Sequence, residues 1–220
     1  MIRLHNLNVV VVFTFMGKKV SANRLTFSPT DPSFRLVASY LMAFQGFVSA
    51  VEIYNGDQPP VPWPADDTAV IDAAAAGQTL TFKPRALVEA MVKNRWPDEV
   101  SFEVEAMPPV LAGSAINLGV LENFMFGLGQ SLITNFFEEQ RDRLESHYGR
   151  VPNWPNVWNF ARVVRNAMSH GGCITIRDQS RVAWKGLSYS SADNGRKIVN
   201  VDIWPGDLFI LVKELERALP

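Results

Sequence analysis

Cysteine is almost absent from the 220-residue sequence, where Cys173 is the only one. A single thiol cannot form a disulfide within the chain, which excludes a disulfide-stapled scaffold. With one cysteine and three histidines, a structural zinc site is not expected either, and we expect no metal or other cofactor. The sequence also lacks a glycine-rich phosphate loop, a dinucleotide fingerprint and a serine-hydrolase elbow.

Long apolar runs are lacking as well. The longest, residues 9–16, is well short of the roughly 18–20 residues that cross a bilayer, so we expect no membrane segment. Two lysines, Lys18 and Lys19, follow this run, which fits a buried strand better than a secretory signal. We therefore expect a cytoplasmic protein.

The charge is balanced in total but uneven along the chain. With 47% hydrophobic residues the chain can bury a core, and a net charge of −1 argues against a generally basic nucleic-acid coat protein. Residues 150–197, however, hold 8 basic and 2 acidic residues, a net charge of +6, and include Trp154, Trp158, Trp184 and Tyr189. Cations among aromatics suit an RNA backbone with stackable bases. The alternative is a solvated basic face with the aromatic residues in the core.

The residue pattern predicts a mixed α+β fold. In the first half, hydrophobic periodicity predicts strands at residues 7–14, 24–28, 80–82 and 100–105, and helices at residues 31–54, 67–76 and 84–95. Asp31 is expected to cap the first helix, and Leu87, Met91 and Val92 are expected to face inward from the third. Four prolines in residues 56–67 predict a loop.

Pro108-Pro109 marks the predicted boundary between an α+β lobe of unknown role, residues 1–108, and a helical part, residues 109–220. In the second part the pattern predicts helices at residues 114–147, 155–170 and 205–219, and two or three short strands at residues 174–176, 182–184 and 198–203. Gly127 and Gly129 predict a kink or a close helix contact in the first of these helices.

The helix that ends before Gly171-Gly172 has an unusual polar face. Arg162, Asn166 and His170 are four residues apart and therefore share one stripe, with Arg165 and Ser169 beside it. A protein core excludes these residue types, and no carboxylate close in sequence is placed to neutralise the arginines.

This face holds part of the chemistry for RNA cleavage without a metal. That reaction needs a base for the 2′-hydroxyl, an acid for the leaving oxygen and a cation at the phosphorane. Imidazole exchanges a proton near neutral pH, and an arginine fork matches phosphate oxygens, so His170 and Arg165 are the candidates. One set is incomplete, so we expect a homodimer that brings two such helices together. The alternative is a histidine cap beside an ordinary surface arginine.

Neighbouring residues add three expectations. Glu122 is a candidate to pair with Arg162 or Arg165 and so orient the guanidinium. The charged residues 138–145 are expected to form a solvated helix end. His147 is either a second catalytic histidine or, better, part of a helix C-cap.

The stretch ARVVRNAMSHG, residues 161–171, resembles the signature of the HEPN superfamily (higher eukaryotes and prokaryotes nucleotide-binding). That signature is an arginine, often with a polar follower, then four to six residues and a histidine. Here the follower is Asn166 and the spacer is four residues. The similarity covers residues 109–220, whereas the strands expected in residues 1–108 lie outside the usual all-helical HEPN bundle.

The resemblance implies a dimeric helical bundle with the motifs facing each other, commonly a metal-independent endoribonuclease of toxin–antitoxin or phage-defence systems. It implies that Arg165 grips the scissile phosphate, Asn166 orients that phosphate or the histidine, and His170 acts as acid or base. Arg162 and Ser169 match no position of the motif and are expected only as substrate-binding neighbours. The implied partners are RNA or a nucleotide and, in a toxin system, an antitoxin protein. The alternatives are a non-catalytic RNA- or nucleotide-binding module and a structural dimerisation protein.

Overall fold

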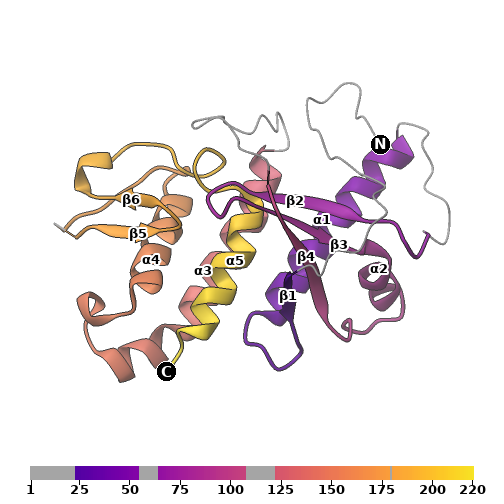
Figure 1. The fold of residues 1–220 in the computed structure, drawn as a ribbon, viewed down its shortest axis with the longest axis horizontal. Helices are drawn as coiled ribbons and strands as arrows, with labels where there is room; N and C mark the ends of the chain where they lie inside the picture. The colour runs from indigo at the N-terminus through magenta and orange to yellow at the C-terminus, as the bar shows by residue number, and fades with distance from the viewer. Residues whose placement is uncertain (1–22, 55–63, 108–121, 179) are drawn as a thin grey trace.

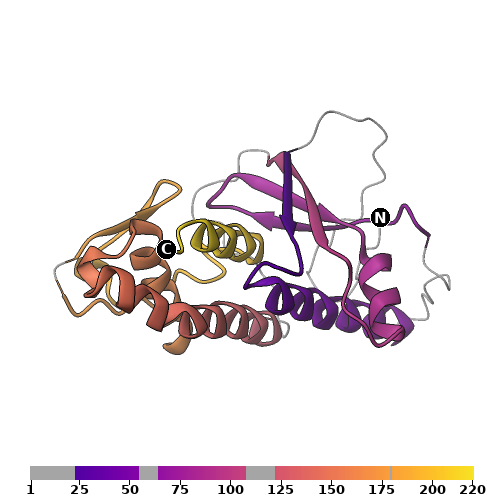
Figure 2. The ribbon, with the colours of Figure 1, turned by 90° about the horizontal axis from the view of Figure 1, so that it is seen from below.

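A computed structural model describes residues 23–54, 64–107, 122–178 and 180–220 of the chain (Figure 1). The mixed α+β class is confirmed: one lobe holds a four-stranded antiparallel sheet, and the other holds helices with a two-stranded hairpin. Figure 2 shows the last helix lying between the sheet and the rest of the second lobe. The two lobes therefore meet along this helix.

The first lobe is a twisted sheet with helices beside it. The strands are β1 (Asn23–Phe27), β2 (Ala69–Ala73), β3 (Gln78–Phe82) and β4 (Val100–Ala106), in the order β1-β4-β3-β2. Side chains at alternate positions of these strands are buried, as expected for a sheet with one covered face: Leu25, Phe27, Ile71, Leu80, Phe82, Val100 and Phe102. The helices are α1 (Phe34–Tyr54) and α2 (Pro84–Val92).

The second lobe is built on helices α3 (Glu122–Tyr148), α4 (Asn156–Ser169) and α5 (Pro205–Arg217), which pack on one another. A 3₁₀ turn, Val151–Asn153, joins α3 to α4, and a second one, Ser191–Asp193, follows the hairpin. The hairpin consists of β5 (Val182–Trp184) and β6 (Leu187–Tyr189). The predicted β-hairpin insert is therefore confirmed in its two-stranded form.

The helix predicted at residues 67–76 was wrong, because this segment forms strand β2 and the turn after it. Ala69, Ile71 and Ala73 are buried at alternate positions, and β2 pairs with β3 along its whole length. Gly77 closes the turn at φ +62°, a conformation that glycine adopts without strain. The run of alanines favours a helix locally, but pairing within the sheet decides the conformation.

Three other local predictions need correction. Asp31 does not cap α1, which begins at Phe34; its carboxylate accepts the Ser28 N–H at 2.8 Å instead. Helix α2 ends at Val92 and buries the face of Pro84, Leu87 and Ala90, which leaves Val92 81% exposed and Met91 45% exposed rather than inward-facing. Residues 174–176 are irregular and follow an isolated bridge between Cys173 and Lys197, and residues 198–203 form a tight turn with a bridge between Val199 and Ile203 and with Asn200 at φ +61°. Such irregular backbone depends on contacts that periodicity does not encode.

Helix α1 is the one described helix that is long and apolar enough to cross a membrane by length and composition. Its window Phe34–Val51 has a mean hydropathy of 1.4, and 44% of it is buried inside the structure. This window is not an uninterrupted apolar run, since it contains Arg35 and Gln45, and the absence of a membrane segment stays a prediction. The exposed side of α1 begins with Arg35 and continues with the small uncharged residues Ser39, Ala43 and Gly46, while Leu41 and Phe44 face the core.

Gly129 makes the close helix contact that the sequence predicted. A Cβ at this position would lie 2.8 Å from Leu208 Cδ1 and 3.4 Å from Met168 Cε, so α3 approaches both α4 and α5 there. A Cβ added at Gly127 would meet no atom within 4 Å, so this glycine plays no part in the contact. Residues 7–14 and 114–121, and the boundary at Pro108-Pro109, lie outside the described residues.

The first turn of α5 docks directly on the sheet. A Cβ at Gly206 would lie 2.6 Å from the carbonyl oxygen of Asp72, so only glycine fits. The buried carboxylate of Asp207 accepts the N–H groups of Trp204 at 2.8 Å, Ala75 at 3.2 Å and Ala76 at 3.0 Å. Asp207 therefore caps α5 and binds the β2–β3 turn at the same time.

Apolar contacts continue this junction. The Phe209 ring lies 4.9 Å from the ring of Tyr40 and 5.2 Å from that of Phe102, between centroids. The buried apolar side chains of both lobes form one continuous cluster. The lobes thus share a core.

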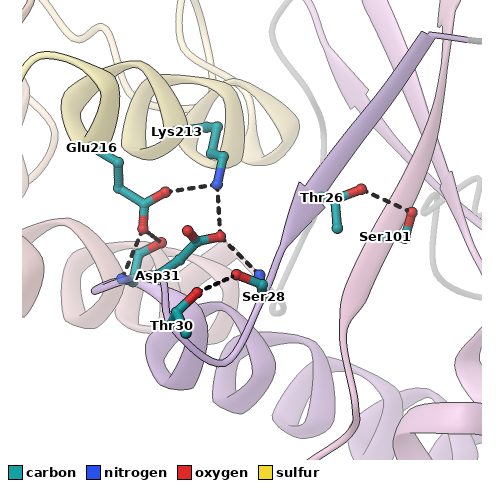
Figure 3. Close-up of polar contacts among 8 residues, drawn as sticks. Thr26, Ser28, Thr30, Asp31, Ser101, Lys213 and Glu216 are labelled. Atoms are coloured by element: carbon teal, nitrogen blue, oxygen red, sulfur yellow. Dashed lines mark hydrogen bonds and ion pairs between the residues drawn. The ribbon is translucent and has the colours of Figure 1, made fainter.

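A polar cluster fastens the other end of α5 to the turn before α1 (Figure 3). Lys213 Nζ lies 2.7 Å from Asp31 Oδ2 and 3.0 Å from Glu216 Oε2. Glu216 Oε1 in turn accepts both the backbone N–H of Ser33 at 2.9 Å and its hydroxyl at 2.5 Å. Burial raises the pKa of Asp31, but the hydrogen bonds from Lys213 and Ser28 outweigh it and leave the pKa below its usual value.

Replacement of Gly206 by alanine tests the docking of α5. We expect Gly206→Ala to lower the free energy of unfolding by about 2–4 kcal/mol, because the new Cβ collides with backbone atoms of Asp72. Gly127→Ala is the matched control, since this glycine is exposed in helix α3; it should raise stability by about 0.5–1 kcal/mol. Chemical denaturation measures the free energy of unfolding of both variants. Equal changes in the two variants would contradict the close docking of α5 at Gly206.

The pH dependence of stability tests the environment of Asp207. Burial raises the pKa of Asp207 to about 6, although hydrogen bonds from backbone N–H groups lower it. A carboxyl with a raised native pKa stabilises the fold most when protonated, so its contribution falls as pH rises from about 4 to about 6. The free energy of unfolding of wild type minus that of Asp207→Asn should therefore drop over this interval, by about 1–3 kcal/mol. A constant difference in urea titrations across this range would show that burial does not control this carboxyl.

Candidate functional site

Helix α4 buries one side and leaves the predicted polar face at the surface. Trp158, Ala161 and Val164 are fully buried, and the indole N–H of Trp158 donates to the Leu215 carbonyl in α5 at 3.2 Å. Arg162, Arg165 and Asn166 are half-buried, whereas Ser169 and His170 are exposed. The amphipathic pattern therefore fixes which way the candidate residues face.

Two glycines end α4 at the candidate site. His170 occupies the C-cap, and its backbone N–H donates to the Ala167 carbonyl at 2.9 Å. Gly171 and Gly172 follow at φ +66° and +86°, and the Gly172 N–H donates to the same carbonyl at 2.8 Å. This is a left-handed helix ending of the kind that favours glycine, as the sequence predicted. The imidazole of His170 consequently stands at the exposed tip of the helix.

Arg165 is held in place from three sides. Its Nη1 donates to Asn166 Oδ1 at 3.1 Å, its Nη2 forms an ion pair with Glu138 of α3, and its Cζ lies 6.0 Å from the ring centroid of Phe137. The Nε–H of Arg165 is buried without a hydrogen-bond partner among the described residues. The guanidinium is thus oriented, and 31% of the side chain remains exposed.

Arg162 points toward a different part of the lobe. Its Nη2 lies 3.4 Å from Asp178 Oδ2, in the segment between α4 and β5. Hydrogen bonds from Ser180 hold the pKa of Asp178 below its usual value, and the charge of Arg162 adds to this. Arg162 and Arg165 therefore share a helix face but have separate carboxylate partners.

The structure brings the five candidate residues onto one helix end but joins only some of them. Arg165 and Asn166 are hydrogen-bonded, and the Ser169 hydroxyl donates to the Arg165 carbonyl at 3.2 Å. Within the described residues, the His170 side chain makes no hydrogen bond or ion pair, so it is free to meet a ligand or a second chain. Arg162 lies beside this group with its charge turned to Asp178.

Tertiary contacts neutralise much of the basic segment at residues 150–197. Five of its eight cations form ion pairs with described carboxylates: Arg162 with Asp178, Arg165 with Glu138, Lys185 with Glu214, Arg196 with Asp193 and Asp202, and Lys197 with Glu122. Three of these acids come from α3 and α5, outside the segment. The basic surface is therefore much smaller than the net charge of +6 suggests.

The aromatic residues of this segment lie in the core. Trp154, Trp158, Trp184 and Tyr189 are at most 7% exposed, and Tyr189 stacks on Phe160 with centroids 5.7 Å apart. They cannot stack on nucleic-acid bases without unfolding the lobe. The alternative assignment, aromatic core residues beside charged surface residues, is the one that the structure confirms.

The structure also tests the expectations for Glu122 and His147. Glu122 pairs with Lys197 and not with Arg162 or Arg165, because the antiparallel packing of α3 and α4 places Glu138 beside Arg165. His147 lies in the last turn of α3, beside the start of α4. The 14 residues of α4 span about 20 Å, so His147 is far from His170 in the same chain.

Comparisons with known proteins give no family assignment: no protein-family model matches the chain, and neither a curated protein nor a solved structure matches it. The HEPN resemblance of residues 109–220 therefore stays a prediction. Across the residues that the structure describes, no group of three or more His, Cys, Asp or Glu side chains is placed to hold a metal ion.

Sequence reasoning missed the residues that surround Arg165. Glu138 was expected in a solvated helix end, yet it forms the ion pair with Arg165, and Phe137 supplies the ring beneath the guanidinium. An available signal was the antiparallel hairpin of two helices joined by a short connection centred on Val151–Asn153. Counting back from that connection on one helix and forward on the other places residue 138 near residue 165.

Proposed function

We propose that the protein is a metal-independent endoribonuclease of the HEPN type that acts as a homodimer. The observation that carries the proposal is the clustering of Arg165, Asn166 and His170 at one end of α4, with the guanidinium oriented and the imidazole exposed. Three packed helices around this end agree with a helical-bundle domain.

The proposed reaction is attack of a ribose 2′-hydroxyl on the adjacent phosphate. A neutral imidazole takes the proton of the 2′-hydroxyl, the 2′-oxygen bonds to phosphorus, and the bond to the 5′-oxygen breaks. An imidazolium protonates the departing 5′-oxygen, which leaves a 2′,3′-cyclic phosphate and a 5′-hydroxyl. Arg165 would stabilise the negative charge that builds on the phosphorane oxygens.

A second copy of the chain would complete this site. One α4 tip offers one histidine, whereas the reaction uses one base and one acid. A two-fold dimer with the α4 ends facing each other would supply two histidines and two arginines. The proposal includes RNA as the substrate, a cytoplasmic location and, if the chain is a toxin, an antitoxin protein as partner. Ser169 and Arg162 would contact the RNA backbone at the edge of the site.

A non-catalytic RNA- or nucleotide-binding module is the second candidate. One observation favours it: the end of α4 carries a single histidine, His170, whereas cleavage uses both a base and an acid. Both functions would use the same helix end, so the experiment that separates them asks whether the bound RNA is cleaved or stays intact.

Incubation of the purified protein with RNA in EDTA tests the proposal. We expect fragments ending in 2′,3′-cyclic phosphate, and a loss of at least a hundredfold in cleavage rate for both Arg165→Ala and His170→Ala, because each removes a group used at the reacting phosphate. Circular dichroism should show that both variants keep the fold, since His170 is exposed and Arg165 is only half-buried.

Matched controls come from elsewhere in the chain. Arg24→Ala removes an exposed cation of β1, and His147→Ala removes the other described histidine; both should retain cleavage. RNA that binds through Arg165 but stays intact would establish the binding module instead. RNA affinity that neither site substitution changes would leave a structural dimerisation role, in which the arginine and the histidine only terminate a helix.

A further inference from the structure

Arg165, the proposed phosphate ligand, is already occupied by a carboxylate from its own chain. Glu138 Oε1 pairs with Nη2 of Arg165, one of the two terminal nitrogens with which an arginine fork binds phosphate. Both side chains are partly exposed, at 31% for Arg165 and 39% for Glu138, so an ion from solution can reach them. A phosphate and the Glu138 carboxylate would therefore compete for the same N–H groups.

Glu138 has a second cation to which it can move. Its other oxygen, Oε2, lies 3.9 Å from Nη1 of Arg141, three residues further along α3. Arg141 is at the same time hydrogen-bonded to Glu145 at 2.7 Å, so it is held on this side of the helix. A carboxylate that leaves Arg165 would thus remain near a positive charge.

The orientation of Arg165 does not depend on Glu138. Asn166 accepts a hydrogen bond from the other terminal nitrogen, Nη1, and the Phe137 ring lies beneath the guanidinium. Neither contact involves Glu138, so the arginine would stay oriented if the carboxylate left. An orienting function for Glu138 is therefore redundant in this geometry.

From these contacts we infer that Glu138 is a built-in competitor of the phosphodiester at Arg165, with Arg141 receiving the carboxylate when RNA binds. The inference rests on the proposed function, because it concerns the same arginine. It gives the site a preference for polyanions, since an RNA strand that also contacts Arg162 and Ser169 can displace Glu138, whereas a single small phosphate competes for Arg165 alone.

Neutralising Glu138 tests the inference. We expect Glu138→Gln to tighten binding of a fluorescein-labelled 12-nucleotide 2′-O-methyl oligouridine, which has no 2′-hydroxyl to attack the phosphate and so stays intact, by roughly two- to fivefold, the range expected for loss of a partly exposed competing ion pair. The control Glu139→Gln removes the same charge one residue away, from an exposed side chain with no ion pair to a described residue. It should leave the affinity within error of wild type.

A double-mutant cycle separates competition from general electrostatics. In an Arg165→Ala background, Glu138→Gln should no longer tighten binding, because the competitor acts only through that arginine. The affinity of Glu138→Gln for inorganic pyrophosphate should rise by a larger factor than its affinity for RNA. Melting temperatures should show that the Gln variants stay folded, since glutamine is also a good helix former.

Several outcomes would overturn the inference. Weaker RNA binding by Glu138→Gln would make Glu138 an orienting residue, and equal gains from Glu138→Gln and Glu139→Gln would reduce the effect to long-range charge. Absence of RNA binding in every variant would overturn the proposed function, but a pyrophosphate gain confined to Glu138→Gln would still support competition at Arg165. If Glu138→Gln raises neither the affinity for RNA nor the affinity for pyrophosphate, the inference is overturned.

Discussion

The docking of α5 on the sheet is the contact on which the rest of the structure depends. Gly206 lets the first turn of α5 approach the Asp72 carbonyl, and Asp207 binds both its own helix and the β2–β3 turn. Because α5 is fixed in this way, its other side can hold α4 through the bond between Trp158 and the Leu215 carbonyl. The helix that carries the candidate site is thus positioned from the opposite lobe of the protein.

This arrangement gives the first lobe a physical part in the site. Residues 1–108 share no features with the HEPN signature, yet their sheet and the turn at Asp31 clamp both ends of α5. A half-buried ion-pair cluster such as that of Lys213 and Glu216 contributes orientation more than net free energy, because desolvation offsets much of the attraction. The sheet therefore acts as a support for the helical lobe, whatever else it binds.

Electrostatics at the candidate site follow from neighbours that are distant in sequence. Arg165 meets Glu138 and Arg162 meets Asp178, so the two cations have different surroundings although they lie three residues apart on one helix. A local net charge summed along the chain misses this, since each side chain responds only to charges within a few ångströms in space. The pairing also explains how two arginines can lie half-buried on α4.

The sequence by itself determined the mixed class, the extents of most helices and the polar face of α4. Those features depend on hydrophobic periodicity and helix-ending glycines, which act within a few residues. Only the tertiary structure decided that residues 69–73 form a strand, that four aromatic residues are buried, and that Glu138 faces Arg165. These depend on which segments pack together, and local pattern carries little information about contacts between segments far apart in the chain.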